Sequence, residues 1–83
     1  MTQFDKLLLK VRQLDNNMRF QEVKWILETY GYSMKSPSGG SSHMTFRKKG
    51  SPPITIPRHS PIKHIYIQMV KEIVEEEESS NDN

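Results

Sequence analysis

The chain has 83 residues, enough for one small domain, and its lack of cysteine excludes disulfides and thiolate metal sites. The formal net charge is only +2, but it is unevenly placed: residues 1–71 carry twelve Lys or Arg against four acids, whereas residues 72–83 carry six acids and no base. No apolar run approaches the length of a membrane span and none resembles a signal peptide, so we expect a cytoplasmic protein without membrane contact.

Two amphipathic helices are expected first along the chain. Apolar residues at helical spacing predict a helix over 4–14, which the polar residues 15–17 end. A second helix is predicted over 20–30, with Gly31 in the left-handed conformation just after it. Trp25 lies off the apolar stripe of this helix, so it either packs against the first helix or stays partly exposed.

Three short strands are expected next. Alternating residues and turn-forming sequences predict strands over 32–35, 43–48 and 54–56, joined by a loop over 36–41 and a turn over 49–52. The alternation in the second strand places Met44 and Phe46 on one face and His43, Thr45 and Arg47 on the other.

A third helix is predicted over 62–77, with Ile62, Ile65, Met69 and Ile73 in one apolar row and Tyr66, Val70 and Val74 beside it. Residues 75–83 lack apolar side chains and are expected to form an acidic tail without regular structure. Helices and consecutive strands without βαβ alternation predict an α+β domain over 1–74, with helices on one face of a three-stranded antiparallel sheet.

The most informative segment runs from Lys35 to Lys71, with seven Lys or Arg, three His and no acid. Such a segment suits contact with phosphates. Histidine can accept or donate a proton near neutral pH, so His43 is a candidate for acid/base chemistry on RNA, with Arg47, Lys48 or Arg58 stabilising charge on the phosphate. The competing interpretation is an ordinary polar strand residue on a basic domain.

The other candidates are less specific. His59 lies in a loop after a strand and could contact a phosphate, while His64 is interpreted as structural or solvated. The run Arg47-Lys48-Lys49 fits either phosphate binding or a charged hairpin end that resists edge aggregation. The three histidines lack a compact ligand spacing, so no metal site is expected.

The sequence resembles the HicA family of mRNA interferase toxins from type II toxin–antitoxin systems. The resemblance rests on Ser42-His43 followed three residues later by Phe46, and it covers about residues 20–74 through the segments 20–32, 40–48, 54–57 and 68–71. The family motif has glycine before the serine, where this chain has Ser41, with Gly40 one position earlier. Residues 1–17 form an added N-terminal helix relative to the shortest members.

The resemblance implies a double-stranded-RNA-binding-domain-like fold and an endoribonuclease that cleaves mRNA without a metal or small-molecule cofactor. It implies His43 as the catalytic residue and a HicB-type antitoxin as the protein partner. The RNA contacts expected are Ser42, Arg47, Lys48, Lys49, Arg58 and His59. Two alternatives stay open: a non-catalytic RNA-binding module of the same fold, and a domain that binds only proteins.

Overall fold

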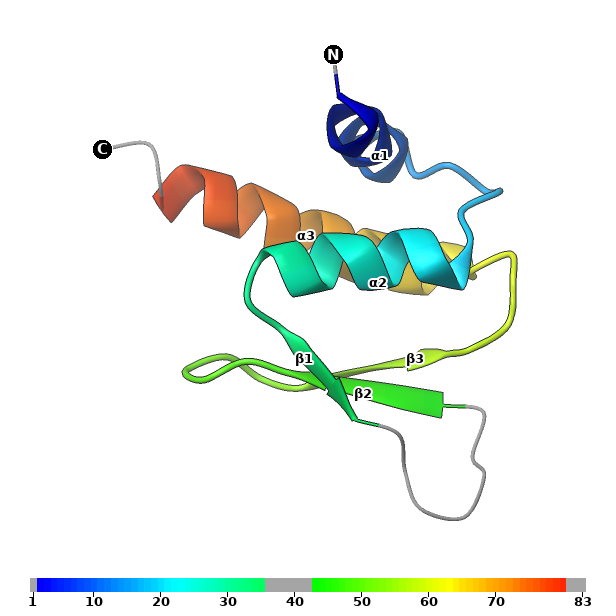
Figure 1. Cartoon of the computed structure of the whole chain (residues 1–83). Coiled ribbons are helices and arrows are strands. Elements are labelled where there is room, and N and C mark those ends of the chain that lie inside the picture. Colours follow the sequence, from blue (N-terminus) through cyan, green and yellow to red (C-terminus); the bar gives the residue numbers. More distant parts are fainter. Residues whose placement is uncertain (1, 36–42, 81–83) are drawn as a thin grey trace.

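The computed structural model describes residues 2–35 and 43–80, which form three helices and three strands (Figure 1). The α+β class expected from the sequence is confirmed. In chain order the elements are α1 (Gln3–Arg12), α2 (Phe20–Thr29), β1 (Ser33–Lys35), β2 (His43–Arg47), β3 (Ile54–Pro57) and α3 (His64–Ser80).

Helix α1 begins at a capping box. The Thr2 hydroxyl accepts a hydrogen bond from the Asp5 N–H, and the Asp5 carboxylate accepts one from the Thr2 N–H, both at 3.1 Å. The pKa of the Asp5 carboxyl is lowered, first by the hydrogen bond from the Thr2 backbone and then by that from its side chain. These bonds satisfy donors that the first helical turn would otherwise leave unpaired.

Helix α1 ends earlier than the polar residues 15–17 predict. Leu14 takes a left-handed conformation with φ of 55°, and the N–H of Asp15 donates to the carbonyl of Lys10 at 3.0 Å. This is the hydrogen-bond pattern of a Schellman motif, which usually has glycine at the left-handed position. A leucine gave no signal for it in the sequence.

Helix α2 ends as the sequence predicts. Gly31 has a φ of 97°, and the Tyr32 N–H donates to the Leu27 carbonyl at 3.0 Å. The chain therefore reverses at Gly31 and enters β1 directly. Trp25 is 44% exposed, and its ring also contacts the Phe4 ring of α1 with centroids 5.7 Å apart, so both alternatives for this residue hold in part.

The sheet is antiparallel with the strand order β1-β2-β3. Its register aligns Met34, Phe46 and Ile54 in one row across the three strands, and Met44 opposite Ile56 in the next. Of these five residues, all but the half-buried Met34 are buried, so one face of the sheet faces the core. The predicted sidedness of β2 is confirmed.

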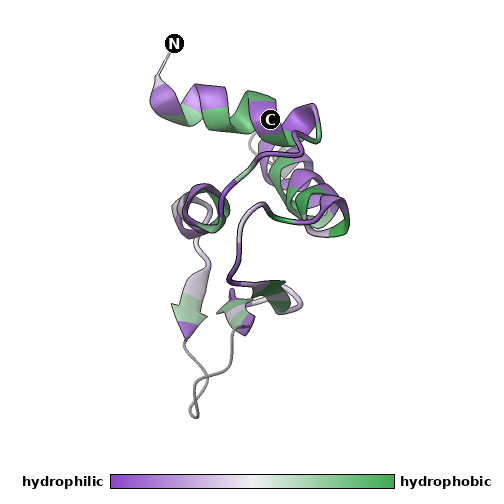
Figure 2. Cartoon of the chain, turned by 90° about the vertical axis from the view of Figure 1, so that its right-hand side faces the viewer, coloured by the Kyte–Doolittle hydropathy of each residue, from purple (hydrophilic) through white to green (hydrophobic). Residues whose placement is uncertain are grey.

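The helices form two further layers on that face of the sheet. Helices α2 and α3 lie directly over the strands, and α1 lies on their far side (Figures 1 and 2). One continuous core joins all three layers; α1 contributes Leu7, Leu8 and Val11, and the sheet contributes Met44, Phe46, Ile54 and Ile56. Helix α1 therefore caps the helical layer.

The buried row of α3 differs from the prediction. Its fully buried members are Ile67, Val70 and Val74, whereas Ile65 is 64% exposed and Met69 is 37% exposed. Both sets follow helical spacing, because this helix carries apolar residues around much of its circumference. Which side faces the core is decided by the position of the helix over α2 and the sheet. Val70 and Val74 belong to the set predicted beside the main row, and periodicity alone did not show that this side is the buried one.

The prediction that the acidic segment lacks regular structure from residue 75 onward is also wrong for the part that the structure describes. Helix α3 continues to Ser80. Glu77 pairs with Lys48, and Glu78 pairs with Arg12 of α1. These pairs bring cations from distant parts of the chain to a helix end where glutamates alone would be unfavourable. Residues 81–83 lie outside the described residues.

Candidate nucleic-acid interface

The outer face of the sheet, turned away from the helices, is polar. Alternation along the strands sends to this face the side chains that are not in the core. Thr45 and Thr55 face each other across β2 and β3 with their hydroxyl oxygens 3.1 Å apart. The outer face is formed by Ser33, Lys35, His43, Thr45, Arg47 and Thr55.

His43 lies at one end of this face, as the first residue of β2. It is exposed and pairs in register with Pro57, the last residue of β3. Arg58 and His59 follow Pro57 directly and are exposed, so the chain brings two further predicted site residues to the same end of the sheet. Ser42 and the preceding Gly40-Ser41 lie outside the described residues.

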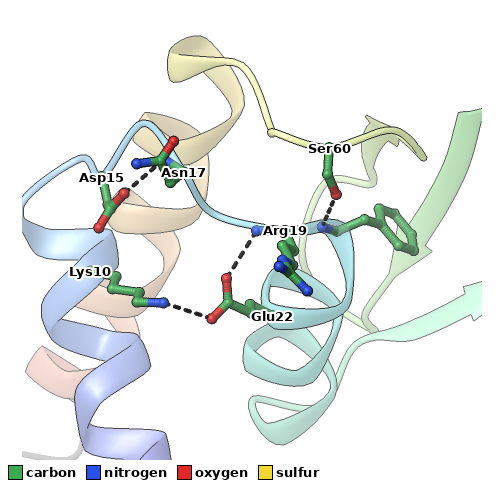
Figure 3. A network of polar contacts seen from close by, with 7 residues as sticks. Lys10, Asp15, Asn17, Arg19, Glu22 and Ser60 are labelled. Atoms are coloured by element: carbon green, nitrogen blue, oxygen red, sulfur yellow. Dashed lines mark hydrogen bonds and ion pairs between the residues drawn. The ribbon is translucent and has the colours of Figure 1, made fainter.

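The segment after β3 is attached to the helical layer. The Ser60 hydroxyl accepts a hydrogen bond from the Phe20 N–H at 3.2 Å (Figure 3). The Ile62 N–H donates to the Met18 carbonyl at 2.9 Å. Both contacts lie at the start of α2, where Ser60 satisfies one of the helix donors. Arg58 and His59 are therefore held between a sheet strand and a helix end.

The start of α2 is held in turn by Glu22. Its carboxylate accepts a hydrogen bond from the Arg19 N–H and another from the Lys10 ammonium of α1, each at 2.9 Å (Figure 3). Burial alone would raise the pKa of Glu22, but the Arg19 N–H and the Lys10 charge outweigh it and hold this pKa below its ordinary value. This network lies in the helical layers and supports the site only through α2.

A second group of predicted residues lies at the other end of β2. Arg47 is four residues beyond His43, which separates their Cα atoms by about 13 Å along an extended strand. Here the surface forms a hollow of about 410 Å³ lined by Ser33, Lys35, Arg47, Lys48, Lys49, Ser51 and Pro53. Lys35, Ser33 and Ser51 were not among the predicted site residues, although pairing of the first two strands would have placed Ser33 opposite Arg47.

Lys48 differs from its two basic neighbours. Its ammonium pairs with Glu77 of α3 and lies 5.7 Å from the centre of the Tyr32 ring, whereas Arg47 and Lys49 are exposed. Continued alternation explains this, because Lys48 follows Phe46 on the core side of the chain. The structure thus separates the run Arg47-Lys48-Lys49 into two outward cations and one that joins the sheet to α3.

Among residues 2–35 and 43–80, no group of three His, Asp or Glu side chains is placed to hold a metal ion. His43 lies in β2, His59 in the loop after β3 and His64 at the start of α3. In the same described part of the chain, no helix is long and apolar enough to cross a membrane.

Comparisons of the chain with protein-family models, with curated proteins and with solved structures found no match. The functional interpretation therefore depends on the chemistry of the sheet face. That face combines one histidine with cations at both ends and leaves the polar Thr45–Thr55 pair between them. It offers a proton-transfer group and donors for phosphate oxygens on one surface.

Proposed function

We propose that the chain is a metal-independent endoribonuclease that acts on mRNA, as its resemblance to HicA toxins implies. The observation that supports this most is the position of His43. It is exposed and lies at one end of the polar and cationic sheet face that the helices leave uncovered. RNA is the polyanion whose own 2′-hydroxyl can serve as a nucleophile, so one histidine and nearby cations suffice for the chemistry.

In the proposed reaction the 2′-oxygen attacks the adjacent phosphorus and the bond from phosphorus to the 5′-oxygen breaks. The products are a 2′,3′-cyclic phosphate and a 5′-hydroxyl. His43 accepts the proton of the 2′-hydroxyl or donates one to the departing 5′-oxygen, and Arg58 stabilises the charge on the phosphorane. His59 lies at the same end of the sheet and is the candidate for the other of these two proton transfers.

The proposed partner protein is a HicB-type antitoxin. A protein that covers the outer face of the sheet would block both His43 and the cations with a single interface. In this proposal α1 and the far side of the helical layer stay outside the covered surface, because they lie opposite the strands.

The test compares the wild type with His43→Ala in cleavage of an mRNA transcript in the presence of EDTA. We expect the alanine variant to be slower by about 10²–10⁴-fold, the usual contribution of a positioned acid or base. His64→Ala is the matched control, because His64 is exposed at the start of α3 and lies off the sheet face. Equal cleavage by the wild type and His43→Ala would refute the catalytic assignment.

The alternative function is a non-catalytic RNA-binding module. The cations about 13 Å from His43 favour it, since they can bind phosphates whether or not the histidine acts on them. This alternative predicts that the wild type binds RNA without cleaving it and that His43→Ala binds equally well. A gel-shift titration beside the cleavage assay separates the two functions.

A further inference from the structure

We propose that the hollow at the far end of β2 is a phosphate-anchoring site that holds RNA several nucleotides away from the phosphate at His43. The inference that one RNA reaches from this hollow to His43 rests on the proposed function. The anchor itself is a binding site that can be tested without cleavage. It predicts that the substrate is a single-stranded RNA of several nucleotides.

The chemistry of the hollow supports an anionic ligand. Lys35 comes from the end of β1, Arg47 from the end of β2 and Lys49 from the turn after it, so separate parts of the chain converge on one concave surface. All three are exposed, and among the described residues no acid lines the hollow. Ser33 and Ser51 add hydroxyl groups that can donate to phosphate oxygens.

An acid close to this surface is already paired. Glu77 holds the Lys48 ammonium, which lies on the core side of the chain next to Tyr32. Lys48 therefore contributes its aliphatic stem to the wall of the hollow, and the charge that faces a ligand comes from Lys35, Arg47 and Lys49. Arginine can bind a phosphate through two parallel hydrogen bonds, which makes Arg47 the principal contact.

The geometry of β2 sets the length of RNA between the two ends. A separation of about 13 Å along the strand corresponds to roughly four steps of a stacked strand, which advances about 3.4 Å per phosphate, so roughly five successive phosphates span it. Between the ends, the Thr45 and Thr55 hydroxyls offer a polar path, and Lys35 flanks it because it pairs in register with Thr45. An RNA of about six or more nucleotides can reach both ends, and a dinucleotide can reach only one.

The first experiment measures binding of a fluorescein-labelled eight-nucleotide single-stranded RNA of mixed sequence, with all proteins carrying His43→Ala to keep the RNA intact. We expect Lys35→Ala/Arg47→Ala to weaken binding at least tenfold and to reduce the salt slope of log K by about 1.4, or 0.7 for each cation lost. The control Lys6→Ala/Lys24→Ala removes the same charge from α1 and α2 and should change neither quantity.

The second experiment measures cleavage of the same RNA and of a dinucleotide by Lys35→Ala/Arg47→Ala with His43 intact. We expect KM for the longer RNA to rise about tenfold with little change in kcat, and the dinucleotide to be cleaved as by the wild type.

If the double variant binds the eight-nucleotide RNA as tightly as the control does, the anchor is refuted while the nuclease proposal stands. If the wild type cleaves nothing but binding still depends on these two residues, the anchor stands and the nuclease proposal fails. The variants Lys35→Gln and Arg47→Gln, each tested singly, replace the double variant should it not fold.

Discussion

Among the single residues, those of β2 show how one alternating strand serves both stability and the proposed chemistry. Phe46 is fully buried and its ring lies 6.1 Å from that of Phe20 in α2, so the strand is fixed to the helical layer. His43 and Arg47 leave the opposite face of the same strand. A rigid strand is a better support for a catalytic side chain than a loop, because packing on one face limits movement on the other.

Gly31 gives a prediction at this scale. Gly31→Ala should destabilise the protein by about 1 kcal/mol, because alanine is strained at a φ of 97°. A methyl group there would meet Lys48 Cε at 3.5 Å, an ordinary contact, so the cost comes from the backbone and not from a clash. For a domain of this size, the melting temperature should fall by about 4–8 °C.

The control for this prediction is Gly31→Asn. Asparagine tolerates the left-handed conformation better than other non-glycine residues, so it should recover part of the lost stability. Thermal unfolding followed by circular dichroism measures all three proteins. If alanine and asparagine are equally destabilising, the backbone explanation is wrong.

Among the elements, helix α2 depends on a carboxylate whose protonation can be followed. The pKa of Glu22 is held below its ordinary value of 4.5. A group with a lowered folded-state pKa stabilises the protein above the unfolded pKa and loses that contribution as the pH falls. The wild type should therefore lose this part of its stability as the pH drops from about 4.5 through the folded pKa, by about 1 kcal/mol, since Lys10 is 42% exposed and solvent screens the pair.

Glu22→Gln tests this pH dependence. Glutamine can still accept the Arg19 hydrogen bond but carries no charge, so the variant should be less stable near neutral pH and should approach the wild type below pH 4. Urea unfolding between pH 2.5 and 7 measures the difference, in which the other carboxylates cancel. A difference in stability that does not change with pH would contradict the proposed role of the Glu22 charge.

Helix α3 gives a second prediction at the scale of elements. Glu77→Gln/Glu78→Gln removes the pairs with Lys48 and Arg12, so amide hydrogen exchange over 75–80 should become several-fold faster. Each pair is partly exposed and contributes at most about 1 kcal/mol, so the amides near Val70 should keep their protection. Glu75→Gln, at an exposed position of the same helix, is the control and should leave exchange unchanged.

The sequence predicted the elements well where local signals decide them and poorly where distant contacts do. The sidedness of β2 and the turn at Gly31 follow from alternation and from glycine chemistry, so they could be read locally. The extent of α3 could not, because Glu77 and Glu78 find their partners 29 and 66 residues away. For the candidate site, the place of His43 on the strand could be predicted, but the separation of Lys48 from Arg47 required knowing where α3 lies.

At the scale of the whole molecule, the charges fall into two regions, whereas the packed core is continuous. The outer face of the sheet carries cations, whereas the end of α3 carries the run Glu75–Glu78, in which Glu77 pairs with Lys48 and Glu78 pairs with Arg12. The core, by contrast, is continuous from the sheet through α2 and α3 to α1. The cations of the sheet face are therefore suited to a polyanionic partner, and α1 belongs to the same folding unit as the site.

The continuity of the core predicts a single cooperative unfolding transition. Trp25 belongs to α2 and its ring contacts Phe4 of α1, so its fluorescence reports on the attachment of α1. Circular dichroism reports on the helices as a whole. Leu7→Ala should destabilise the protein by about 2–5 kcal/mol, because Leu7 is buried in the shared core. Both signals should shift together in urea, since removal of a core side chain from α1 weakens the same unit that holds the sheet.

Leu9→Ala, on the exposed side of α1, is the matched control and should shift neither signal appreciably. A fluorescence transition that precedes the circular dichroism transition in Leu7→Ala would show that α1 unfolds independently, and it would then have no part in supporting the sheet face.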